Sequence, residues 1–143
     1  MNRKLFLLAY VADRWVAIDA GDVDSVVDIG GIVAVPRAPG AVRGLAALRS
    51  RVVTVIDTRV TLGLSPTATP RRAVIAQIDG HHYAFLVDAL EDIAPFERHP
   101  LSAGLALENG WDAAAAGIVE RDGEPLLVID LKVLVPAADR AAA

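Results

Sequence analysis

The sequence predicts an all-β protein made of two small five-stranded β-barrels that share a hydrophobic core, with a few short helices. Most apolar segments are short, rich in Val and Ile, and bounded by turn residues, which is the pattern of strands. A Val-Ile-Asp strand end occurs twice, at 55–57 and at 128–130. Segments with helical periodicity are few and short. Together these features favour two similar β units.

Five apolar segments in the first half are expected to be strands, at 5–11, 15–18, 26–29, 42–48 and 52–56. A continuation of the third segment at 33–35 is interrupted by Pro36 and Pro39, because proline cannot donate to a β-ladder. The second half repeats this plan at 73–78, 83–87, 89–93, 117–120 and 126–129. Its two Asp-Gly pairs, at 79–80 and 122–123, are strong signals for hairpin turns.

Helices are expected to be short. Asp57 and Asp130 are predicted to cap helices over 58–62 and 131–135, since an aspartate before a helix accepts from its free N–H groups. Segment 101–107 can form one or two turns, and 113–116 is either helix or loop. The tail 137–143 is expected to fray.

The chain reads as one domain with an internal repeat. Segment 55–60 matches 128–133, and the hairpin at 5–18 matches 73–86. The first predicted lobe spans about 4–64, and a C-terminal segment is expected to pack against it. A linker at about 65–72 joins it to the second lobe, which spans about 73–136. A lobe of about 60 residues is marginally stable alone, so we expect an apolar core between the two.

Composition excludes several classes of function. The net charge is −4, so no basic field attracts nucleic acid or anionic lipid. The chain has no cysteine, which rules out disulfides and thiolate chemistry. Hydrophobic residues make up 54%, but the apolar runs are far shorter than the roughly 20 residues that cross a bilayer. Asp13 and Arg14 follow the N-terminal run directly, so we interpret 5–11 as a strand rather than a signal peptide.

The sequence offers little catalytic chemistry. It contains no phosphate-binding glycine loop and no nucleophile elbow. His81 and His82 are neighbours on a strand and point to opposite faces, so they cannot easily share a metal ion. The aspartates at 22, 24 and 28 lack the glycine and glutamate of a calcium loop. We therefore expect no catalytic residue, no cofactor and no metal.

Residues 44–59 carry a resemblance to a known family. They read Gly-Leu-Ala-Ala-Leu-Arg-Ser-Arg-Val-Val-Thr-Val-Ile-Asp-Thr-Arg. This hairpin, with the opening hairpin and the closing Val-Ile-Asp strand, resembles the CheW family of chemotaxis coupling proteins over about 4–136. The resemblance implies two SH3-like barrels and a cytoplasmic, non-enzymatic adaptor. It also implies two partners, chemoreceptors and the regulatory domain of a CheA-type histidine kinase, which is itself CheW-like. Self-association stays open.

The resemblance also implies binding residues. Arg49 matches the signature arginine, implicated in contacts with receptor and kinase. Val23 and Val26 fall on the receptor-binding segment, Leu45 and Leu48 shape the adjacent strand, and Leu105 and Leu107 fall on a region that meets the kinase. Three positions depart from the signature, where Ala47 replaces Asn, Ser50 replaces Gly and Thr54 replaces Pro. Ala47 and Ser50 are nevertheless expected among the protein-binding residues. The family commonly has an acidic residue at one position of the receptor-facing segment, and this chain has Ser25 there.

Three hypotheses follow for function. The first is a scaffold that couples receptor to kinase. The second, suggested by Ala47 and Ser50, is a divergent structural or competing component of a signalling array that binds without activating the kinase. The third is an enzyme or small-molecule binder on the same fold, which a deep polar pocket with convergent carboxylates would favour. At Ser50 a positive φ would be disfavoured by about 1–2 kcal/mol, so we expect this turn to differ in shape from a glycine turn.

Overall fold

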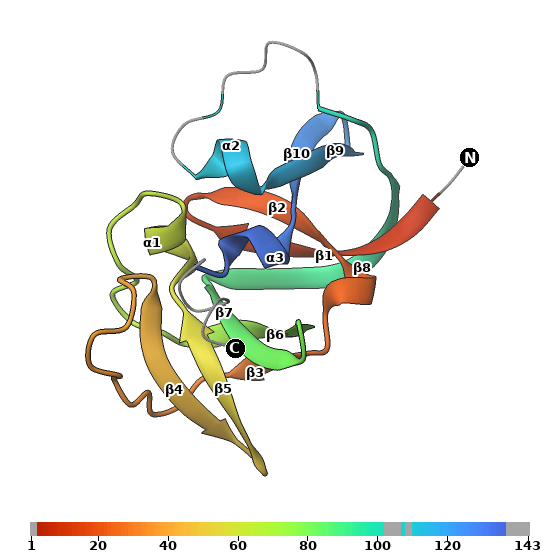
Figure 1. The fold of residues 1–143 in the computed structure, drawn as a ribbon. Helices are drawn as coiled ribbons and strands as arrows, with labels where there is room; N and C mark the ends of the chain where they lie inside the picture. The colour runs from red at the N-terminus through yellow and green to blue at the C-terminus, as the bar shows by residue number, and fades with distance from the viewer. Residues whose placement is uncertain (1–2, 102–106, 108–109, 137–143) are drawn as a thin grey trace.

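The fold consists of two five-stranded sheets and a few one-turn helices (Figure 1). The computed structural model describes residues 3–101, 107 and 110–136. Sheet A has the order β8 (Ala89–Glu97), β1 (Arg3–Val11), β2 (Arg14–Asp19), β10 (Glu124–Ile129) and β9 (Ala115–Arg121). Sheet B has the order β3 (Ser25–Asp28), β6 (Arg72–Ile78), β7 (His81–Val87), β5 (Arg51–Ile56) and β4 (Val42–Leu48). The predicted mainly-β class is confirmed.

The predicted strands are present, with small changes at their ends. The largest difference is β8, which was expected to end at Ile93 and continues to Glu97 because it pairs along the whole start of β1. Segment 33–35 is not a strand, and only Val33 forms an isolated bridge, to Leu45. The short helices are η1 (Ala20–Asp22), α1 (Thr58–Thr61), α2 (Trp111–Ala114) and α3 (Leu131–Leu134). Most of the segment expected to turn at 101–107 lies outside the described residues.

The two sheets exchange their first hairpins. Sheet A takes β1 and β2 from the first half of the chain and its other three strands from the second half. Sheet B takes β6 and β7 from the second half and its other three from the first. The two strand orders become identical when each strand is replaced by its counterpart in the other half of the chain, β1 by β6 through β5 by β10. The internal repeat is therefore present in the structure. However, the predicted lobe boundaries at 4–64 and 73–136 do not coincide with the sheets.

Neither sheet closes into a barrel through a continuous ladder. An isolated bridge joins the segment after β3 to β4, through Val33 and Leu45. A second bridge joins the segment after β8 to β9, through His99 and Ile118. Each sheet therefore curls until its two edges meet at a single point, which covers part of the exposed edge.

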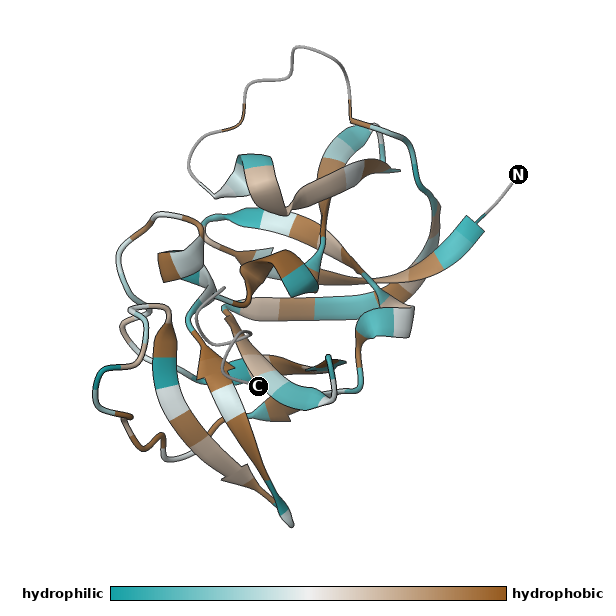
Figure 2. Cartoon of the chain, in the orientation of Figure 1, coloured by the Kyte–Doolittle hydropathy of each residue, from teal (hydrophilic) through white to brown (hydrophobic). Residues whose placement is uncertain are grey.

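Three hydrophobic clusters fill the molecule, as the brown segments of Figure 2 indicate. One lies within sheet A around Phe6 and Val128, and one within sheet B around Val53 and Ala84. The largest contains residues of both sheets, including Leu7. The expected core between the lobes is confirmed, and it explains how two marginal units become stable together. No helix in the described part of the chain is long and apolar enough to span a membrane.

The two aspartates that were predicted to cap helices behave differently. Asp130 is a cap, because its Oδ1 accepts a hydrogen bond from the Lys132 N–H at 3.0 Å. Asp57 precedes α1 but makes no side-chain cap hydrogen bond. The prediction was therefore wrong for Asp57, whose carboxylate is fully buried and binds elsewhere.

Candidate protein-binding surfaces

The turn of the β4–β5 hairpin differs from the other tight hairpin turns of the chain. In the turns Ala12-Asp13, Asp79-Gly80 and Asp122-Gly123, both residues have a positive φ. In the β4–β5 turn the positive φ is that of Arg49, at 55°, and not of Ser50. This fits the expectation that Ser50 would change the shape of the turn. The left-handed conformation disfavours any residue with a Cβ, so the strain in this turn lies on its arginine.

The guanidinium of Arg49 is available to a partner. Arg49 is exposed at the hairpin tip, and no interaction of its side chain with any other described residue is found. Its neighbour Arg51 is engaged, with Nη1 lying 3.4 Å from Asp24 Oδ2. An unpaired arginine supplies several planar donors and is frequent at the centre of protein interfaces.

A groove of about 500 Å³ opens between the hairpin tip and β3. Four of the predicted binding residues line it, namely Val26, Leu48, Arg49 and Ser50, together with Asp24, Ser25, Val27, Arg51 and Ile75. The ion pair between Arg51 and Asp24 joins its two walls. The structure thus brings together residues that lie far apart in the sequence, with apolar side chains and charged groups lining one groove.

Leu45 and Ala47 lie on the outer face of the hairpin. Both are exposed, whereas Ala46 between them is buried within sheet B, as strand alternation requires. Ala47 lies directly opposite Val52, which is 62% exposed, and the exposed Val33 bridges to Leu45. We call Val33, Leu45, Ala47 and Val52 the hairpin face. Sequence reasoning missed Val33 and Val52, although the alternation along β5 already placed Val52 on the side opposite to buried Val53.

Three further exposed apolar side chains lie on the sides of the two sheets that face the shared core. Val26 is 42% exposed and lies opposite Val74, a member of the inter-sheet core. Ile93 is 51% exposed and lies opposite Leu7, another member of that core. Leu5 is two residues before Leu7, so it points to the same side of β1.

We call Val26, Ile93 and Leu5 the inter-sheet margin. Each projects from a sheet on the side that faces the shared core, yet each remains exposed. Leu5 and Ile93 were not predicted as binding residues, because only the pairing of β1 with β8 reveals that they share a face.

The remaining predicted residues lie elsewhere. Val23 is half-buried, packs against the inter-sheet core and lines a separate cavity. Leu107 is half-buried and packs against the same core. Leu105 lies outside the described residues. The structure therefore divides the predicted residues among a groove, a strand face and the inter-sheet core.

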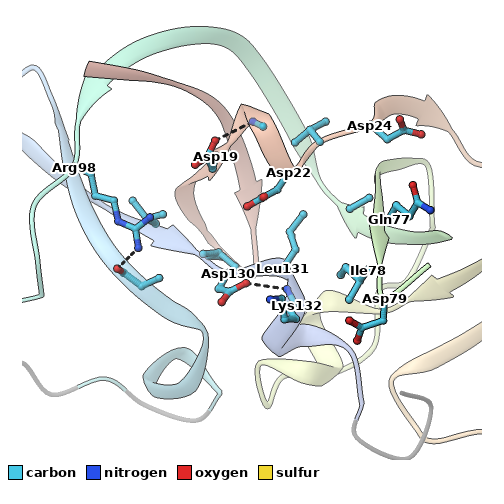
Figure 3. A pocket seen from close by; sticks show the side chains of 16 residues that line it. Asp19, Asp22, Asp24, Gln77, Ile78, Asp79, Arg98, Asp130, Leu131 and Lys132 are labelled. Carbon is cyan, nitrogen blue, oxygen red and sulfur yellow. Dashed lines mark hydrogen bonds between the residues drawn. The ribbon is translucent and has the colours of Figure 1, made fainter. Parts of the chain in front are cut away.

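A polar cavity of about 690 Å³ lies where the end of β2, η1, the β6–β7 turn and the start of α3 come together (Figure 3). Five aspartates line it, at 19, 22, 24, 79 and 130. Two of them are held by hydrogen bonds to backbone N–H groups two residues further along the chain. Asp19 accepts from the Gly21 N–H and lies 3.4 Å from Lys4 Nζ, while Asp130 accepts from Lys132. Among the described lining residues there is no Ser, Thr, Tyr or His, so the cavity offers neither a hydroxyl nucleophile nor an imidazole base.

Asp22, which lies in this cavity, has a perturbed acidity. Desolvation by burial raises its pKa, and the negative charges of Asp19 and Asp130 raise it further. Lys132 and Lys4 lower it by a smaller amount. The negative charge of Asp22 is thus unfavourable in the folded protein.

Within the part of the chain that the structure describes, no group of three or more His, Asp or Glu residues could hold a metal ion. His81 and His82 alternate in burial along β7, and His99 Nε2 lies 3.6 Å from Glu97 Oε2. The histidines are thus placed as separate surface groups.

Comparisons with known proteins agree with this architecture. A family model described as CheW-like domain matches residues 5–139. A chemotaxis protein CheW of Rhizobium meliloti is 27% identical over 111 residues, covering 76% of this chain and 72% of the relative. A chemotaxis protein CheW of Thermotoga maritima is 21% identical over 126 residues, covering 87% of this chain and 83% of the relative.

A solved structure has the same fold. The crystal structure of a scaffolding protein, TtCheW from Thermoanaerobacter tengcongensis, superposes with a TM-score of 0.80. The match covers 93% of this chain and 92% of the other at 24% identity. Because the family model spans nearly the whole chain, which has the same two-sheet architecture as the scaffolding protein, this chain belongs to the CheW-like domain family.

Proposed function

We propose that this protein is a non-enzymatic, cytoplasmic adaptor that couples chemoreceptors to a CheA-type histidine kinase. The observation that carries the proposal is the β4–β5 hairpin, which presents exposed apolar side chains and an unpaired Arg49 at one end of a stable core. A strained arginine whose side chain has no partner among the residues that the structure describes contributes little to the fold. Such a residue is better explained by an external contact than by stability.

The two apolar surfaces suit two different partners. The inter-sheet margin contains Val26, so we assign it to the receptor. We assign Leu107 and the β4–β5 hairpin to contacts with the kinase. Arg49, at the tip of this hairpin, would lie near both partners. The large aliphatic side chains of the two surfaces are 37% to 71% exposed, so each can bury further area on docking, and that burial favours association.

Reconstitution with a receptor signalling fragment and a CheA-type kinase tests the proposal. The expected result is a ternary complex in which kinase autophosphorylation rises when this protein is added. Arg49→Ala should weaken binding while the thermal melting point stays nearly unchanged. If wild-type protein binds neither component, the proposal is wrong, and if Arg49→Ala binds as wild type does, Arg49 is not part of the site.

A second candidate function is a structural or competing component of a signalling array. Ala47 and Ser50 favour it, because both are exposed near Arg49 and both depart from the family signature, which has asparagine and glycine at these positions. Losing an asparagine at position 47 removes both a donor and an acceptor. Binding to both partners without kinase activation would support this role. Restoration of activation by Ala47→Asn would show that the departure is the cause.

A further inference from the structure

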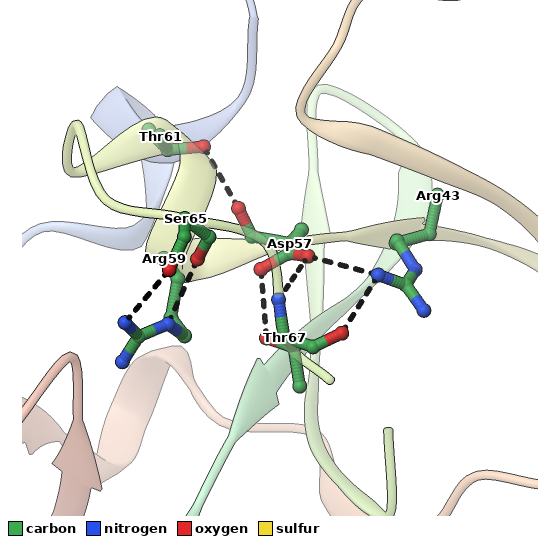
Figure 4. A network of polar contacts seen from close by, with 6 residues as sticks. All are labelled: Arg43, Asp57, Arg59, Thr61, Ser65 and Thr67. Atoms are coloured by element: carbon green, nitrogen blue, oxygen red, sulfur yellow. Dashed lines mark hydrogen bonds and ion pairs between the residues drawn. The ribbon is translucent and has the colours of Figure 1, made fainter. Parts of the chain in front are cut away.

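The carboxylate of Asp57 lies fully buried between β5, β4 and the linker 65–72 (Figure 4). Its Oδ2 accepts a hydrogen bond from the Thr67 N–H at 2.9 Å, and its Oδ1 accepts one from Thr67 Oγ1 at 2.8 Å. Arg43 Nη1 lies 3.3 Å from Oδ2 and donates to the Thr67 carbonyl oxygen at 2.9 Å. Three segments that are separate in the sequence therefore meet at one buried charge.

Arg43 reaches this point because it is the extra residue of a β-bulge. Val42 pairs with Ile56 and Gly44 pairs with Val55, so Arg43 has no partner on β5. A bulge redirects the side chain of the extra residue and bends its strand. Beside it, Gly44 adopts a φ of 144° and allows the carbonyl of Val33 to approach, which permits the bridge that joins the edges of sheet B.

Sheet A has an equivalent β-bulge, but its extra residue is not an arginine. Its bulge falls at position 116, since Gly117 pairs with Val128 and Ala115 with Ile129. The spacing from Gly117 to Asp130 equals that from Gly44 to Asp57, and the backbone N–H groups of both aspartates donate to equivalent carbonyls. The residue equivalent to Arg43 is Ala116. Alanine brings no guanidinium from the bulge to Asp130, whose carboxylate caps α3 instead, while the Ala116 carbonyl accepts from Arg98 Nη2 at 2.6 Å.

We infer that Arg43, Asp57 and Thr67 form a latch that ties the linker to the bulge and thereby fixes the direction of the β4–β5 hairpin. Thr67 holds the linker, Arg43 holds the bent strand, and Asp57 joins the two through its carboxylate. The linker is also held at its start, where Arg59 Nε donates to the Ser65 carbonyl at 2.9 Å. These are positioning residues, because they lie at the base of the hairpin while Arg49 lies at its tip.

The latch distinguishes the two halves of the repeat. Both sheets have the bulge, but only in β4 does it carry an arginine, which ties the hairpin that bears Arg49 to the linker. The consequence for partner binding rests on the proposed function, whereas the direction of the hairpin is measured without any partner.

Spin labels test the latch directly, since the chain has no cysteine of its own. Labels are placed at Ser50→Cys on the hairpin tip and Glu124→Cys at the start of β10, near opposite ends of the molecule in Figure 1. Distances are measured by double electron–electron resonance in the full chain. We expect Thr67→Val, which removes only the hydroxyl donor, to broaden the distance distribution. Arg43→Ala, which copies sheet A, should broaden it further and shift its maximum.

Two controls separate positioning from stability. Asp130→Ala removes the cap of α3 and lowers the melting point, but should leave the distribution unchanged because the Asp130 carboxylate bonds to Lys132 within α3 and not to a linker or a bulged strand. Thr67→Ser restores the hydroxyl and should restore the wild-type distribution. An unchanged distribution in both Thr67→Val and Arg43→Ala would overturn the latch. The proposed function fails separately if the wild-type protein shows a narrow distance distribution but binds neither receptor nor kinase.

Discussion

Gly44 and the carbonyl oxygen of Val33 lie so close together that a Cβ at position 44 would overlap that oxygen. The contact sits beside the bridge between Val33 and Leu45, which joins the two edges of sheet B. Closure of this sheet therefore depends on the absence of one side chain.

Gly44→Ala should destabilise the protein strongly. The φ of 144° is already unfavourable for alanine, and the new Cβ would force the backbone of Val33 to move. Gly80→Ala is the matched control, because its φ is also positive, at 83°, but nothing lies near its Cβ. We expect the control to cost about 1–2 kcal/mol and Gly44→Ala clearly more, as measured by urea unfolding. Equal costs would show that the contact does not restrict the sheet.

Asp57→Ala and Asp130→Ala should have unequal effects, although the two aspartates occupy equivalent positions. Asp130→Ala removes one exposed cap hydrogen bond and should cost about 1 kcal/mol. Asp57→Ala leaves the two Thr67 donors and part-buried Arg43 without their acceptor, and should cost about 2–4 kcal/mol. Denaturant unfolding of both variants measures the difference. Equal losses would indicate that the buried network contributes no more than a cap.

Arg49→Gly should stabilise the protein slightly while removing the side chain proposed to bind. Glycine adopts a φ of 55° without a Cβ penalty, so the expected gain in unfolding free energy is up to about 1 kcal/mol. Arg49→Ala, which keeps the Cβ, should be close to neutral. Calorimetry gives the stability and a binding titration with receptor and kinase gives the affinity. A loss of stability in Arg49→Gly would mean that the guanidinium supports the fold.

Serine substitutions can distinguish the two apolar surfaces. Ile93→Ser and Val26→Ser change the inter-sheet margin, and Val52→Ser changes the hairpin face. All three side chains are exposed, so thermal stability should change little. We expect the first two to weaken binding of a receptor fragment by about tenfold, which corresponds to roughly 1.4 kcal/mol, and Val52→Ser to leave it unchanged. The reverse pattern would assign the receptor to the hairpin face.

The raised pKa of Asp22 makes stability depend on pH. The folded protein holds this proton more tightly than the unfolded chain, so stability falls as pH rises from the ordinary aspartate pKa through the raised one. Above both values the charged group opposes folding. Asp22→Asn should therefore be more stable than wild type at neutral pH, and the advantage should shrink as the pH falls through this window. Urea midpoints of both proteins across the acidic range measure this; a pH-independent difference would contradict it.

The strand pattern could be predicted from the sequence because each strand is defined by its neighbours along the chain. Alternating or continuous apolar residues and Asp-Gly turns fixed the hairpins at 73–87 and 117–129. The repeat of Val-Ile-Asp also predicted two equivalent units. The sequence did not show which hairpins share a sheet, since the pairing of β2 with β10 and of β7 with β5 depends on contacts between residues far apart in the chain.

The candidate site was predicted only in part. Val26, Leu48, Arg49 and Ser50 were predicted through the resemblance, and the structure brings them to one groove. Leu5 and Ile93 could not be found, because an exposed residue becomes part of a surface only when its neighbour across the sheet is known.

The two aspartates show where sequence information ends. That Asp57 and Asp130 each follow a strand and precede a short helix could be read from the sequence, because that relation is local. That Asp130 caps its helix while Asp57 binds Thr67 and Arg43 depends on how distant segments meet in the fold. A buried carboxylate takes the strongest donors within reach, and at Asp57 the bulge of β4 brings in an arginine.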